Sequence, residues 1–118
     1  MKKTTLLQKS LHEHGVLIVP AVYDCLSARI VEAIGFKSAI LASSMTGDAQ
    51  FGLPPIGLPT ATEVVNLAGY IADAVEIPLI VEAEDGFGGA LAAYRATREF
   101  IKKGLQALSS ATGNIRCW

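Results

Sequence analysis

The chain has 118 residues, with 10 Lys and Arg facing 11 Asp and Glu, and 51% of its residues are hydrophobic. This length suits one domain and is too short for a complete (β/α)8 barrel, which needs about 250 residues. The sequence has no basic cluster that would favour a nucleic-acid partner and no apolar run near the roughly 20 residues that span a bilayer.

Periodicity and turn residues divide the chain into short alternating elements. In chain order we expect helix 4–14, strand 16–19, helix 25–34, strand 38–42, a Gly-, Pro- and Ser-rich loop 43–59, a helix from 61, strand 79–84, a glycine loop 86–89, helix 90–103 and a strand that begins at 105.

Residues at the helix ends support these boundaries. Asp24 is a candidate N-cap for helix 25–34, and Gly35 stands where a left-handed C-terminal residue is expected. Thr60 and Glu63 have the spacing of a capping box, in which each side chain bonds the other residue's backbone N–H.

Alternating strands and helices predict βαβ units and a parallel sheet. The fold class is therefore α/β. One domain is expected over residues 1–108, followed by an irregular tail over 109–118, where the periodicity stops.

Cysteine and histidine provide no site of their own. Cys25 and Cys117 form no disulfide framework and no zinc-binding spacing, which favours a reducing, cytoplasmic location. His12 and His14 are two residues apart on a predicted helix, so they do not face one ligand together, and we expect them to be exposed.

The strongest candidate site is the end of the strand over 79–84. Glu82 and Glu84 alternate with Ala83, so both side chains are expected on one face of the strand. Two carboxylates there would suit a hard cation such as Mg2+, which prefers carboxylate oxygen and water. The alternative interpretation is a solvated strand end with surface acids.

Two further segments are weaker candidates. Residues 86–89 are rich in glycine and precede a helix, so their N–H groups would receive an anion or simply form a βα turn. Residues 43–47 follow a predicted strand and would either hold a substrate carboxylate or carbonyl or serve as a polar loop.

Several segments together resemble the isocitrate lyase/phosphoenolpyruvate mutase superfamily. The resemblance covers about residues 6–108, and its motifs occur in the family's order and spacing. The matching segments are 23–31, 35–37, 52–58, 77–88 and 95–99.

This resemblance implies a fold, a cofactor and a substrate class. The chain would form roughly the first half of a TIM-type (β/α)8 barrel, bind Mg2+ and belong to a homo-oligomer. The family's members act on small 2-oxo- or 2-hydroxy-carboxylates through an enolate-like state, usually by C–C bond cleavage. A metal and N–H donors suit that chemistry because both stabilise a developing oxyanion.

The resemblance also assigns individual residues. Ser43, Ser44 and Met45 match the family's substrate-binding segment, where backbone donors would serve. Glu82 and Glu84 take the positions of its two metal-site aspartates. Pro55 stands where the family typically has an aspartate, and proline cannot ligate a metal or accept a proton.

The family's later motifs have no counterpart in this sequence. Residues 109–112 stand where an acidic strand end is expected, and the loop that carries the lyases' catalytic cysteine is absent, so no catalytic residue is assigned. We therefore expect a truncated or frameshifted lyase-like chain that is inactive alone. The alternative is a non-catalytic fragment that acts as a binding or oligomerising module.

Overall fold

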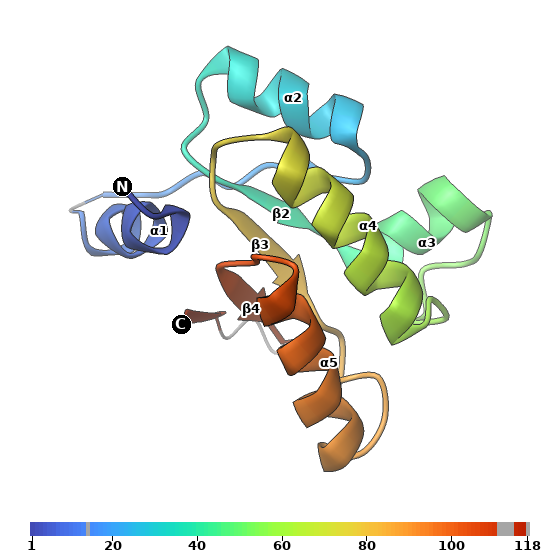
Figure 1. Cartoon of the computed structure of the whole chain (residues 1–118). Coiled ribbons are helices and arrows are strands. Elements are labelled where there is room, and N and C mark those ends of the chain that lie inside the picture. Colours follow the sequence, from blue (N-terminus) through green and yellow to red (C-terminus); the bar gives the residue numbers. More distant parts are fainter. Residues whose placement is uncertain (14, 111–114, 118) are drawn as a thin grey trace.

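The computed structural model describes residues 1–13, 15–110 and 115–117. Helices and strands alternate along most of these ranges, as predicted (Figure 1). The elements are α1 (Lys3–His12), β1 (Ala21–Val22), α2 (Cys25–Ile34), β2 (Ala39–Leu41), α3 (Ser43–Phe51), α4 (Ala61–Ala74), β3 (Leu79–Glu82), α5 (Ala90–Lys102), β4 (Ala107–Ser109) and β5 (Ile115–Cys117).

The strands form one sheet in the order β1-β2-β3-β4-β5. The first four strands are parallel, with Ile40 aligned to Ile80 and Ile80 aligned to Ala107. Parallel neighbours need crossover connections, and α2, α4 and α5 lie in those connections. Strand β3 is therefore central, and its carboxyl end lies beside the carboxyl ends of β2 and β4.

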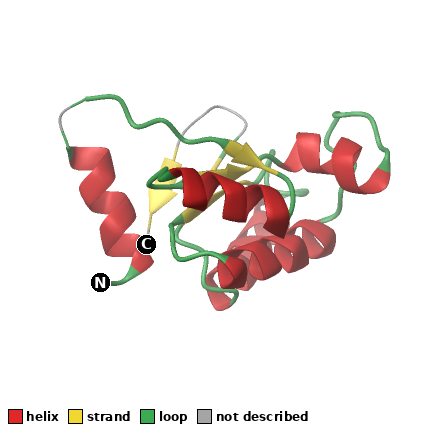
Figure 2. Ribbon diagram, turned by 90° about the horizontal axis from the view of Figure 1, so that it is seen from above, coloured by secondary structure: helices red, strands yellow, loops and turns green. Residues whose placement is uncertain are grey.

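The two faces of the sheet have separate cores. Leu79 and Val81 of β3 belong to a large cluster with buried residues of α2, α4 and α5. Ile80 points to the other face, where it clusters with Leu7 of α1 and Ala107 of β4. Figures 1 and 2 show α1 set apart from the other helices. Burial on both faces explains why β3 is a continuous apolar run.

Both predicted helix starts are confirmed. The Asp24 carboxylate accepts a hydrogen bond from the backbone N–H of Ser27 at 2.7 Å, and Gly35 ends α2 with a φ of 103°. Thr60 and Glu63 form the predicted reciprocal bonds at the start of α4. These contacts join residues three positions apart, which explains why the local sequence could predict them.

The predicted strand over 16–19 is wrong. The strand begins later, at Ala21, and Val16 and Ile18 are exposed. Because Ala21 pairs with Ile40, residues 16–19 would have to pair with 35–38, which form the C-cap of α2 and the turn after it. The run therefore has no extended partner.

The predicted loop over 43–59 is also wrong in its first half, which forms the helix α3. Position 47 of this helix has room only for glycine, because a Cβ added there would lie 2.8 Å from Pro59 Cγ. The helix ends at Gly52, which has a φ of 63° and donates its N–H to the Asp48 carbonyl. Packing against the following loop overrides the weak helix propensity of this segment.

The tail expected over 109–118 contains regular structure. Ser109 belongs to β4, and β5 pairs antiparallel with β4, aligning Leu108 with Arg116. The free edge of β4 supplies backbone partners that a periodicity search along the tail cannot detect. The rest of that prediction, over 111–114 and at 118, lies outside the described residues, as does His14.

A search of the described helices finds none that is both long and apolar enough to cross a membrane.

We predict that α1 stabilises the fold through Leu7, which is fully buried. Leu7→Ala should lower the free energy of unfolding by about 2–5 kcal/mol, because it leaves a cavity against Ile80 and Ala107. Leu11→Ala, at a 41% exposed position of the same helix, is the matched control and should change it by less than about 0.5 kcal/mol. Urea denaturation measures both values, and equal effects would contradict the described packing of α1.

Candidate functional site

Ser43 lies where β2 ends and α3 begins, and its side chain is fully buried. Its backbone N–H donates a hydrogen bond to Glu82 Oε2 at 3.2 Å. Its hydroxyl donates a second bond to Glu84 Oε1 at 2.5 Å. The carboxyl ends of the adjacent parallel strands β2 and β3 thus bring both carboxylates onto one residue. The expected strand over 79–84 ends at Glu82, so the two carboxylates meet at Ser43 without sharing a strand face.

The geometry of this convergence differs from simple strand alternation. Strand β3 ends at Glu82, and Glu84 lies beyond it with a left-handed φ of 47°. The last bond of the ladder joins the N–H of Ala83 to the carbonyl of Ser109 at 2.8 Å. Glu84 therefore reaches Ser43 from the loop after β3.

The two carboxylates form a site of concentrated negative charge. Partial burial raises the pKa of Glu82 above its ordinary value, the charge of Glu84 raises it further, and the N–H of Ser43 opposes both effects. Within the described ranges, the ion pair between Lys102 and Glu99 is the only one, so neither Glu82 nor Glu84 has a cationic partner.

The donor set fits Mg2+, the metal that the family resemblance implies. Across the described part of the chain no group of three or more His, Cys, Asp or Glu side chains lies close enough to bind a metal. Mg2+ keeps several waters, however, and is commonly held by only one or two carboxylates. The second oxygens, Glu82 Oε1 and Glu84 Oε2, make no hydrogen bond to another described residue, so each carboxylate retains an oxygen for a cation.

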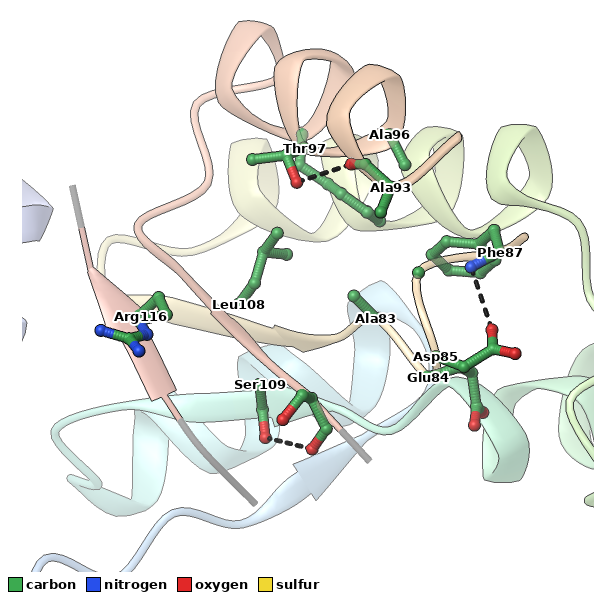
Figure 3. Close-up of a pocket in the computed structure, with 13 residues that line it drawn as sticks. Ala83, Glu84, Asp85, Phe87, Ala93, Ala96, Thr97, Leu108, Ser109 and Arg116 are labelled. Atoms are coloured by element: carbon green, nitrogen blue, oxygen red, sulfur yellow. Dashed lines mark hydrogen bonds between the residues drawn. The ribbon is translucent and has the colours of Figure 1, made fainter. Parts of the chain in front are cut away.

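Two cavities meet at the loop after β3. One of about 320 Å3 lies between this loop and the segment that leads into α4. A larger one of about 630 Å3 lies between the loop, α5 and β4 (Figure 3). Glu84, Asp85 and Phe87 line both cavities. A small ligand therefore has room on either side of Glu84.

The other two residues predicted to bind substrate lie in the first turn of α3. Ser44 is half-buried and the Met45 side chain is 55% exposed. Backbone N–H groups of a first helical turn have no partner within the helix. Ala42, the residue before the helix, provides no capping side chain. The backbone donors of Ser44 and Met45 therefore remain available at the same end of the sheet as the carboxylates.

The remaining candidates make no hydrogen bond to Glu82 or Glu84 in the described part of the chain. Pro55 is in an exposed turn after α3. In the segment 86–89, the N–H of Gly86 donates to the Ala83 carbonyl and that of Phe87 donates to Asp85, which supports the interpretation as a βα turn. His12 bonds the carbonyl of Gln8 on its own helix.

Thr46 belongs to the candidate segment 43–47, but the sequence assigns no individual role to its side chain. It is fully buried one turn after Ser43, and its hydroxyl has no hydrogen-bond partner among the described residues. The spacing of three residues from Ser43 would have indicated a shared helix face, had the segment been identified as a helix.

These observations define a class of protein. Its members have an α/β fold and a carboxylate pair at the carboxyl edge of a parallel sheet. Residues 7–109 match the family model described as phosphoenolpyruvate phosphomutase. The chain belongs to this family.

Curated relatives agree with that assignment. The petal death protein of Dianthus caryophyllus is 38% identical over 108 residues, which are 91% of this chain and 34% of the relative. The 2-methylisocitrate lyase of Bacillus subtilis is 33% identical over 86% of this chain and 33% of the relative. The 2,3-dimethylmalate lyase of Eubacterium barkeri is 28% identical over 92% and 37%. The chain thus spans about a third of the length of these relatives.

Solved structures match with the same partial coverage. A 2,3-dimethylmalate lyase has a TM-score of 0.84 and 26% identity, over 93% of this chain and 39% of that one. An oxaloacetate acetylhydrolase has a TM-score of 0.81 and 28% identity, over 88% and 38%. A phosphonopyruvate hydrolase in complex with oxalate and Mg2+ has a TM-score of 0.86 at 23% identity, which is a likeness of fold. The expected α/β class is confirmed, and the chain covers part of a TIM-barrel-like fold.

We predict a pH signature for the raised pKa of Glu82. The folded state holds this proton more tightly than the unfolded state, so the contribution of Glu82 to stability is full at low pH and is lost as pH rises through the folded pKa. Glu82→Gln removes that titration. In metal-free buffer the variant should therefore gain stability relative to wild type as pH rises from about 4 to 7. Thermal unfolding measures this difference; a constant difference across the range would contradict the prediction.

Proposed function

We propose that this chain holds the metal-binding and carboxylate-binding groups of a carbon–carbon lyase or mutase that acts on 2-oxo- or 2-hydroxy-carboxylates. The observation that carries the proposal is the convergence of Glu82 and Glu84 on Ser43 without a cationic partner among the described residues. The names of the matching lyases, of 2-methylisocitrate and 2,3-dimethylmalate, support the substrate class.

In this proposal Glu82 and Glu84 would hold Mg2+, a cation that is commonly bound by only one or two carboxylates. When bound there, such an ion would supply positive charge that favours a negatively charged oxygen on a substrate. Ser43 fixes both side chains, because its N–H and hydroxyl each occupy one carboxylate oxygen. This leaves the remaining oxygens oriented for the cation.

The backbone N–H groups of Ser44 and Met45 are proposed to receive the substrate carboxylate. They lie in the first turn of α3, where the helix dipole and the unpaired donors both favour an anion. We propose that a complete barrel carries out the whole reaction. We propose the cytoplasm as the location of the protein, because both cysteines are free.

Titration with Mn2+, used as a spectroscopic substitute for Mg2+, tests the metal site. We expect one ion per chain, displaced by Mg2+. Glu84→Gln should weaken binding at least about tenfold, since even changes outside the direct ligands cost 10- to 100-fold. Electron paramagnetic resonance measures the free Mn2+.

Glu76→Gln is the matched control for this titration. Glu76 is exposed and lies before β3, at the opposite end of the strand from Glu82. This variant loses the same charge and should bind as wild type does. Absence of Mn2+ binding by the wild-type chain at millimolar metal would refute the proposed site.

A second candidate function is that of a self-associating module. Within the described residues β1 pairs only with β2, so its outer edge is open. Helix α2 also presents an aliphatic row to solvent. Its members, Leu26, Ile30 and Ile34, are 67%, 51% and 69% exposed. An open strand edge and an apolar surface both favour association, here with a second copy of the chain.

Sedimentation velocity at micromolar concentration tests this candidate. We expect self-association in the wild type and its loss in Ile30→Glu, which places a charge in the middle of the aliphatic row. Leu91→Glu, at an 86% exposed position of α5, is the control and should associate like the wild type. A wild-type chain that sediments as a monomer would exclude the module.

A further inference from the structure

The loop after β3 has an unusual backbone. Glu84 and Phe87 have φ values of 47° and 65°, and two glycines between and beside them, Gly86 and Gly88, have φ values of 97° and 140°. Left-handed φ is ordinary for glycine, but for other residues it costs of the order of 1–3 kcal/mol. Such a conformation persists only where surrounding contacts impose it.

Three contacts hold the loop in this form. Asp85 Oδ1 accepts a hydrogen bond from the N–H of Phe87 at 3.1 Å (Figure 3). The N–H of Gly86 donates to the Ala83 carbonyl at 2.8 Å. The ring of Phe87 lies 6.2 Å from that of the fully buried Phe100 of α5, centroid to centroid. The side-chain acceptor and the aromatic contact therefore act on the same residue.

Close packing against α5 fixes the path of the loop. A Cβ added to Gly86 would lie 2.6 Å from Ala93 Cβ, so this segment has no room to move toward the helix. The opposite side of the loop meets α3, where Glu84 Oε1 accepts a hydrogen bond from the Ser43 hydroxyl at 2.5 Å. The loop thus connects the hydrophobic core under α5 with the carboxylate site.

The left-handed backbone of Glu84 costs free energy, which contacts elsewhere in the loop must offset. Glycine or asparagine would adopt this backbone at lower free energy. Glu84 instead supplies a carboxylate that reaches Ser43 while the chain turns away from the sheet. Asp85 is exposed and has no cationic partner in the part of the chain that the structure describes. Its hydrogen bond to Phe87 is therefore its identifiable structural role.

We propose that Asp85 is a positioning residue for Glu84. Its bond to the N–H of Phe87 forms a turn that seats the Phe87 ring on Phe100, and this turn holds Glu84 in the left-handed conformation that directs its carboxylate to Ser43. The role in metal binding rests on the proposed function above. The role in loop geometry does not.

Two readouts on the full chain test the proposal. Nuclear magnetic resonance of the metal-free protein gives the φ of Glu84 from its HN–Hα coupling and its 13Cα and 13Cβ shifts. Mn2+ titration gives the dissociation constant. Asp85→Ala should lose the left-handed signature and weaken Mn2+ binding about tenfold, which is the lower end of effects from residues that orient ligands.

Asp85→Asn separates the hydrogen bond from the charge. The amide keeps the Oδ1 acceptor and forms the same turn, so this variant should retain the Glu84 signature and the wild-type affinity. Asp85→Ser, whose hydroxyl forms such turns more weakly, should fall between the two and remains informative if Asp85→Ala does not fold. Asp73→Ala, which removes an exposed carboxylate from α4, should change neither readout.

The outcomes are distinct. Persistence of the left-handed signature in Asp85→Ala would overturn the proposal. Equal losses of affinity in Asp85→Asn and Asp85→Ala would also overturn it, because the charge would then be the cause. If the wild type binds no Mn2+ but the backbone signature responds as expected, the proposed metal site fails and the positioning role is supported.

Discussion

The central strand β3 is the constraint on which the rest of the fold depends. Leu79 and Val81 pack under the helices, while Ile80 packs against α1, so both faces of the strand are covered. Burial on both faces leaves no freedom to shift the register, because a shift of one residue would exchange the two cores. The fixed register therefore sets the position of Glu82 at the carboxyl edge of the sheet.

The candidate site begins where this regular geometry ends. Beyond Glu82 the chain leaves the sheet through a strained loop, and Glu84 returns to the same edge from a left-handed backbone position. Ser43 joins the two carboxylates because β2 ends beside β3. The hydrogen bonds offset part of the repulsion between like charges, but they provide no opposite charge. That deficit makes a cation the simplest complement to the site.

Features with local causes could be predicted from the sequence. The caps at Asp24 and Thr60 depend on residues three positions away, and the apolar run of β3 reports its own burial. The missed features depend on distant partners. Residues 16–19 lack a strand to pair with, and β5 exists through its pairing with β4. Helix α3 contains glycine at position 47 because Pro59, twelve residues later, fills the space that a side chain would need.

The sequence by itself determined the α/β alternation, the starts of α2 and α4 and the presence of two carboxylates at or just beyond the end of a buried strand. These follow from periodicity and from contacts within a few residues, which the order of amino acids specifies directly. Only the tertiary structure decided that Glu82 and Glu84 meet Ser43, about 40 positions earlier, and that the Phe87 ring lies against Phe100 of α5. Such contacts depend on strand register and on packing against α5, which no local pattern encodes.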